Sequence, residues 1–290
     1  MGKSILISAL LLAVALVFDL SCEKKTITSR RPDFDEIRAI IYENPDIFLV
    51  DVFDTYKDTS VKPIFFREIT SRDFDLDRAV RNDAKPPLYP FPRIDAVWGD
   101  IMKGVLHYCI DGREYTKQIH AHSFMHAYFE QWGDAYDPYR GWLLKKISGN
   151  VIVSMDTSSR AFEKLHITSS TVDTVLYEYS VLNPTKFSRW SPDKDTILRF
   201  GMGEEVTFTV QSRDTTDYLF LHVGEDGNFR KIPFLSNGDG TFSCSWTTTS
   251  DPGIAKGYKH AFVDAVSRDA LTDTTTEYDS KAWGIIYRIK

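Results

Sequence analysis

The segment WGDIMKGVLHYCIDGREY, residues Trp98–Tyr115, lies at the start of the stretch 98–150, which decides the fold of this chain. Apolar residues there fall mainly on alternate positions, which is typical of a strand with one packed face. Asp111-Gly112 then predicts a two-residue hairpin turn. A return strand from about 114 to 132 and a closing strand from 141 to about 153 complete the stretch. The expected packed face of the first strand consists of Ile94, Ala96, Trp98, Met102, Leu106, Tyr108 and Ile110.

Two amphipathic helices are expected upstream of this stretch. Asp33 with Glu36 three residues later forms a capping-box pattern before a helix whose apolar face repeats at helical spacing. Asn44-Pro45 then predicts a second helix start. In that helix the pairs Phe48 with Val52 and Leu49 with Phe53 are expected to share a face.

A strand is expected next, over residues 73–80. Phe74, Leu76, Arg78 and Val80 alternate there with three aspartates and one alanine. Side chains two positions apart share a face of a strand, so these four residues are predicted to lie on one face.

Two helices followed by long, curved antiparallel strands predict an α+β cone. This pattern resembles the nuclear transport factor 2-like (SnoaL-like) superfamily, and the segment Tyr139–Leu144 resembles the closing strand of its exported members. The resemblance covers about residues 34–153, within a predicted domain of residues 33–155. It implies a cone whose interior is lined by the strands.

Residues 156–290 have a different composition, rich in Ser, Thr and Asp with short β-branched runs. Evenly spaced strand patterns, with a strong turn signal at Asn237-Gly238-Asp239-Gly240, predict an all-β sandwich. This half resembles an immunoglobulin-like or fibronectin type III-like module by strand number and turn spacing alone. The overall prediction is therefore an α+β cone followed by a separate immunoglobulin-like sandwich.

The N-terminus predicts export. Lys3 precedes an apolar run over residues 5–18, which has the length of a secretory signal. Ser21-Cys22 resembles the lipidation site of bacterial lipoprotein signals, although Asp19 departs from that pattern. We expect a signal peptide over 1–21, a lipid on Cys22 that anchors the protein to a membrane, and a polar tether over 22–32. The globular part would then face the periplasm or the exterior of a bacterial cell.

The charge and the cysteine content limit the kinds of partner and cross-link that we expect. The formal net charge of -6, with cations interspersed among the acids, argues against nucleic acid as a partner. Of the three cysteines, Cys109 and Cys244 fall in different predicted domains, so no disulfide framework is indicated.

His120 and His122 are candidate metal ligands. Residues two apart on a strand share a face, so both imidazoles could bind one ion, whereas His126 lies too far along the strand to join them. The competing interpretation is a pair of partly buried sheet histidines, and the sequence favours that interpretation.

Asp100 is the candidate catalytic residue. It interrupts the apolar row between Trp98 and Met102, and within a cone it would line a pocket together with these residues and Leu106. A carboxyl group there would have a raised pKa and could act as general acid or base. The competing interpretation, which the sequence favours, is that the Asp100 side chain binds backbone at a bulge or strand end.

The sequence favours a non-catalytic protein that binds a small molecule or an envelope partner, with no cofactor. The alternative is an enzyme of the isomerase or dehydratase type that uses Asp100 inside the cone. A purely structural spacer is a third possibility. Motifs for phosphate loops, nucleophile elbows and zinc helices are absent from the sequence.

Overall fold

The computed structural model describes residues 31–48, 57–88, 90–155, 162–177, 185–186, 196–212, 214, 216–225 and 228–290. The expected signal peptide, most of the tether and the candidate lipid site Cys22 lie outside these residues. So do Leu49, Val52 and Phe53 of the second expected helix.

Long strands dominate the first half, and shorter strands the second. The first half contains α2 (Arg31–Tyr42), α3 (Pro45–Phe48), β1 (Phe65–Asn82), β2 (Arg93–Ile110), β3 (Arg113–Gln131), η2 (Pro138–Gly141), β4 (Trp142–Ile147) and β5 (Val151–Ser154). The second half contains β6 (Phe162–Thr168), β7 (Asp173–Tyr177), β8 (Thr185–Lys186), β9 (Leu198–Phe200), β10 (Glu205–Ser212), β11 (Tyr218–Glu225), β12 (Asn228–Pro233), β13 (Leu235–Ser236), β14 (Thr241–Thr247), β15 (Lys259–Val266), α5 (Arg268–Thr272) and β16 (Ser280–Ile289).

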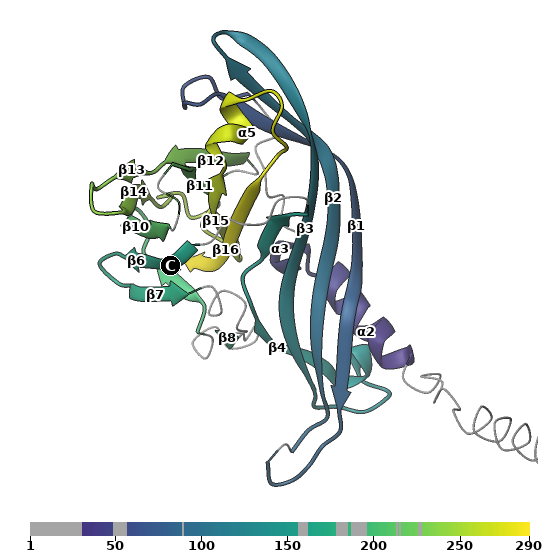
Figure 1. Ribbon diagram of the computed structural model, residues 1–290. Coiled ribbons are helices and arrows are strands. Elements are labelled where there is room, and N and C mark those ends of the chain that lie inside the picture. The colour runs from purple at the N-terminus through teal and green to yellow at the C-terminus, as the bar shows by residue number, and fades with distance from the viewer. Residues whose placement is uncertain are drawn as a thin grey trace, which may run out of the picture.

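The strands form two sheets. The larger has eleven strands with the main order β1-β2-β3-β5-β16-β15-β11-β12, and the smaller has the order β13-β14-β10-β6-β7. In Figure 1, β1, β2 and β3 run side by side as three long, curved strands, and the shorter strands of the second half gather on one side of them. Neighbours on these two paths pair antiparallel, and β9 joins β16 in parallel.

The hairpin turn expected at Asp111-Gly112 is confirmed. β2 and β3 pair without interruption from Arg93 with Glu130 to Ile110 with Arg113, so two residues connect them. Both have positive φ, 48° at Asp111 and 79° at Gly112. An aspartate tolerates this backbone region and a glycine occupies it without strain, as this tight turn requires.

The predicted α+β cone followed by a separate immunoglobulin-like sandwich is wrong. The described residues form mostly strands, with only three short α-helices, and the antiparallel sheet is curled. β5 pairs with β3 on one side and with the C-terminal strand β16 on the other, so one sheet continues from the first half of the chain into the second. Helical spacing upstream of the strands could not reveal this pairing, because it joins residues about 130 positions apart.

The second half packs its two sheets face to face. Their facing residues form one core cluster that includes Leu165 of β6 and Phe208 of β10 on one side, and Leu221 of β11 and Trp283 of β16 on the other. Phe124 of β3 packs against this cluster from the first half. The burial of these side chains from both sheets is what holds the layers together.

α2 and α3 pack against part of one face of the long strands. Ile37 and Ile41 of α2 and Phe48 of α3 are buried in one cluster with Trp98 of β2 and Phe129 of β3. This face carries the apolar row that alternation predicted along β2. We call it the packed face of the long strands, and the opposite side their open face.

Asp33 does not cap a helix as the sequence suggested, because α2 begins at Arg31. Its carboxylate instead accepts a hydrogen bond from Trp142 Nε1 at 3.2 Å and pairs with Arg81 of β1. Asp33 therefore joins the helix to the strands. Its side chain is buried, where an ion partner offsets the cost of desolvation.

A bulge in β1 overturns the expected facing of its side chains. Leu76 pairs with Trp98, but the next paired residue is Arg78, with Val97, so Asp77 is an extra residue. Beyond the bulge, Ala79 lies on the packed face, and Arg78 and Val80 lie on the open face. The prediction that Arg78 and Val80 share a face with Leu76 is therefore wrong, because one inserted residue reverses the alternation.

Candidate functional site

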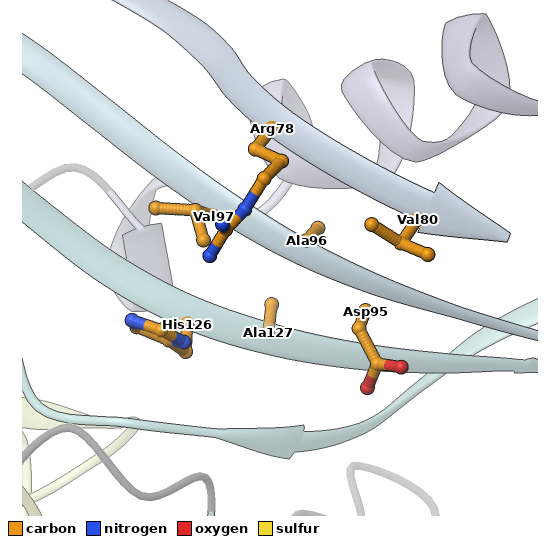
Figure 2. A pocket seen from close by; sticks show the side chains of 7 residues that line it. All are labelled: Arg78, Val80, Asp95, Ala96, Val97, His126 and Ala127. Atoms are coloured by element: carbon orange, nitrogen blue, oxygen red, sulfur yellow. The ribbon is translucent and has the colours of Figure 1, made fainter.

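The open face of the long strands carries a groove with a volume of about 270 Å³. Figure 2 shows the side chains that line it, from β1, β2 and β3. The lining consists of Arg78, Val80, Asp95, Ala96, Val97, His126 and Ala127. We call this the open-face groove.

Strand register builds the open-face groove from two cross-strand rows. The first row is Arg78, Val97 and His126, and the second pairs Val80 with Asp95. Cross-strand partners have Cβ atoms roughly 5 Å apart, so the side chains within each row are neighbours. The Arg78 guanidinium extends past Val97 toward His126 in Figure 2. The bulge at Asp77 is what places Arg78 in the first row.

His126 is a neutral hydrogen-bonding group in this groove. Burial, and secondarily the charge of Arg78, lowers its pKa from the ordinary histidine value. The imidazole is therefore uncharged at neutral pH, and one ring nitrogen can accept a hydrogen bond while the other donates. Arg78 supplies charged donors, and Asp95 supplies a carboxylate that accepts a hydrogen bond from Asn82 Nδ2 at 3.3 Å.

Tyr128 continues the second row beyond Asp95. Its hydroxyl donates to Glu130 Oε1 at 3.0 Å, and burial together with this bond raises the pKa of Tyr128 to about 12. The phenol stays protonated throughout the physiological range, so it contributes a fixed dipole and no charge. The groove itself thus combines the cation of Arg78, the anion of Asp95 and neutral His126 with the side chains of Val80 and Val97.

The candidate metal ligands His120 and His122 lie on the same open face. Their strand partners are Lys103 and Ile101, further along β3 from the groove. Within the part of the chain that the structure describes, no three His, Cys, Asp or Glu side chains are grouped closely enough to hold a metal ion. The pair alone would supply two protein ligands, fewer than the three or four of ordinary zinc sites.

Asp100 lies on the packed face of β2 and is 1% exposed. Its Oδ1 accepts a hydrogen bond from the backbone N–H of Asp73 at 2.9 Å, and Arg72 Nε lies 3.8 Å from its Oδ2. Burial raises the pKa of Asp100, and the Arg72 charge and the Asp73 amide oppose that rise. The carboxyl group therefore ties β2 to β1 across the ladder.

Trp98, Met102 and Leu106, the expected pocket lining, are also buried on the packed face. Trp98 belongs to the cluster beneath the helices, and Met102 and Leu106 belong to a second cluster with Phe220 and Phe262 of the C-terminal strands. The open-face groove lies on the other side of the sheet from them.

A buried polar cluster joins β1 to the C-terminal strands. Arg67 Nη2 donates to Asp264 Oδ2 at 2.7 Å, and Arg67 Nε donates to the Tyr278 hydroxyl at 2.9 Å. His222 Nε2 lies 3.1 Å from the same Asp264 oxygen, and Ser280 Oγ donates to the other at 3.1 Å. Arg67, Asp264 and His222 are each 0% exposed. No substrate reaches groups so enclosed, so we assign the cluster a structural role.

The charge state of this cluster follows from its contacts. Burial by itself would raise the pKa of Asp264, but the Arg67 charge and the His222 hydrogen bond outweigh it and lower that pKa to about 2. Nearby, Lys231 Nζ donates to the backbone carbonyl of Phe65 at 2.8 Å and lies 3.9 Å from the centre of the Phe65 ring. Charged groups thus hold the long strands and the C-terminal strands together in a buried layer.

Cys109 and Cys244 are both free thiols. Cys244 lies in the core of the sandwich, and burial raises its pKa well above the ordinary value, which makes it a poor nucleophile. Cys109 is partly exposed on β2. The two cysteines therefore do not form a disulfide.

Sequence reasoning missed most of the open-face groove. Of its polar residues, the sequence draws attention only to His126, and then as a metal ligand. The alternation in β1 predicts Arg78 on the same face as Leu76, which is wrong, and Asp95 by itself carries no mark of a functional residue. The only available signal was the alternation in β2 and β3, which places Asp95, Val97 and His126 on a common side.

No family model matches this sequence, and no curated protein matches it significantly. The two family resemblances drawn from the sequence therefore stay predictions. Among the residues that the structure describes, no helix combines the length and the apolar character needed to cross a bilayer.

Proposed function

We propose that this protein is a lipid-anchored component of the bacterial cell envelope with a non-catalytic role, and that it binds a small molecule or another envelope component at the open-face groove. The anchor would be the lipid on Cys22. The observation that carries the proposal is the groove itself: Arg78, Asp95 and His126 line one pocket on the open face, opposite the packed face of the same strands.

The chemistry of the groove indicates the kind of ligand. Arg78 would bind an anionic group, and Asp95 would bind a hydrogen-bond donor or a cation. Val80 and Val97 would contact a short apolar part between them. A small molecule that carries both an acceptor and a donor, such as an amino acid, meets these requirements. Neutral His126 would orient it with one hydrogen bond.

The alternative of an isomerase- or dehydratase-type enzyme requires that substrate reaches Asp100. That side chain is 1% exposed, and one of its oxygens is bound to the Asp73 amide. A general acid or base must lie within hydrogen-bond reach of the reacting group. This geometry gives the enzyme hypothesis no support.

Calorimetric titration of the full-length protein with a panel of amino acids would test the proposal. We expect saturable binding of at least one of them, weakened about tenfold or more in Arg78→Gln and Asp95→Asn because each loses a charge-assisted contact. Arg113→Gln is the matched control, since Arg113 is exposed at the far end of the hairpin. Equal binding by Arg78→Gln and the control would refute the assignment of the groove.

A further inference from the structure

We infer that a second groove, at one end of the sandwich, binds an anionic amphiphile: a single fatty chain that ends in a carboxylate. This groove has a volume of about 670 Å³ and lies where β11 and β12 of the larger sheet meet β13 and β14 of the smaller one. The loop before β1 and the start of α5 complete it. Its volume is within the usual range for small-molecule sites, roughly 300 to 1,000 Å³. We call it the sandwich-end groove.

The walls of the sandwich-end groove are apolar. Leu219 of β11 and Phe234 after β12 line it from one sheet, and Phe242 of β14 lines it from the other. All three belong to the sandwich core cluster, so the groove is an opening between the two packed sheets. Leu235 also lines it and is 71% exposed. A fatty chain in this opening would cover the exposed Leu235 side chain, which is favourable.

Two cations lie at the same groove. Lys62 and Arg268 line it from the loop and from α5, and both residues are exposed. The acidic residue among the described lining, Asp217, is buried, so the solvent-facing charge of the groove is positive. The whole chain has a formal net charge of -6, so the positive solvent-facing charge at this groove differs in sign from the charge of the chain. Cations next to an apolar opening fit a carboxylate head on a fatty chain.

The chain's own N-terminal segment is a poor occupant. Residues 23–31 carry Lys24, Lys25, Arg30 and Arg31 against a single acid, Glu23. This segment would bring positive charge to Lys62 and Arg268, which like-charge repulsion disfavours. A fatty carboxylate supplies an apolar chain that matches the apolar walls and a negative charge opposite to Lys62 and Arg268.

Calorimetric titration of decanoate into the full chain would test the inference. The titrated protein carries Cys22→Ala, so that no attached lipid competes for the groove. We expect saturable binding of one decanoate per chain. Lys62→Glu with Arg268→Glu should weaken it about tenfold, because two attractions become repulsions at exposed positions. Leu235→Asp should weaken it as well, and its high exposure means that the fold tolerates the change.

The matched control exchanges two exposed cations elsewhere, Lys256→Glu with Arg113→Glu, and should leave decanoate binding unchanged. Decanol, with the same chain and no charge, should bind more weakly than decanoate. Absence of saturable decanoate binding to the chain would overturn the inference. So would equal decanoate affinity in the Lys62→Glu/Arg268→Glu variant, or equal affinity for decanol. Because the two grooves share no lining residue, these results are independent of ligand binding at the open-face groove.

Discussion

Arg67 and Asp264 form a fully buried ion pair, with Nη2 and Oδ2 2.7 Å apart, between residues 197 positions apart in the sequence. Arg67 lies on β1, at one edge of the larger sheet, and Asp264 lies on β15, deep in the C-terminal part of that sheet. The curl of the sheet brings these two strands together across its packed face. The pair therefore fixes how the long strands sit against the C-terminal strands.

Arg67→Met should destabilise the protein by about 3 to 5 kcal/mol, because it leaves the Asp264 carboxylate buried without its cation. Urea unfolding followed by circular dichroism would measure the loss. The double variant Arg67→Met/Asp264→Asn should recover part of it, since no uncompensated charge remains. A double variant no more stable than Arg67→Met would contradict this account.

Acid should weaken the fold through Asp264. Its pKa in the folded protein, about 2, lies below the ordinary aspartate value of 3.8, so the pair contributes stability above about pH 4 and loses it as pH falls toward 2. The contribution is about 2 kcal/mol for such a shift. Unfolding free energies measured between pH 6 and pH 3 should decline less steeply in Asp264→Asn. Identical slopes for both proteins would exclude Asp264 as the cause.

Because of the bulge at Asp77, we expect two single-residue deletions in β1 to differ in their effect on stability. Deleting Asp77 leaves every later residue with its partner on β2, so Arg78 stays on the open face and Arg81 stays beside Asp33. Deleting Val80 instead moves Arg81 to the open face and breaks its contact with Asp33. We expect the Val80 deletion to lower the melting temperature more than the Asp77 deletion. The reverse order would show that the bulge itself carries the stability.

Membrane attachment should depend on Cys22. Cys22→Ala removes the thiol that would accept the lipid, so the variant should move from the membrane fraction to the soluble fraction of bacterial cells. Fractionation with antibody detection would measure this, and Cys109→Ala is the control because it retains the N-terminal thiol. Continued membrane association of Cys22→Ala would refute the lipid anchor.

Several local features could be predicted from the sequence. Period-two alternation located the packed face of β2, where Trp98, Met102 and Leu106 are all buried. The dipeptide Asp111-Gly112 fixed the hairpin, because few residue pairs adopt two consecutive positive φ angles. These features depend on neighbours in the sequence, and local chemistry suffices to decide them.

Only the tertiary structure decided the architecture and the sites. The pairing of β5 with β16 and the ion pair of Arg67 with Asp264 depend on contacts between distant segments, which no local pattern encodes. The same holds for the open-face groove, where one extra residue in β1 turns Arg78 toward Val97 and His126. Alternation along a strand gives the order of faces, but bulges and long-range pairing determine which side chains meet.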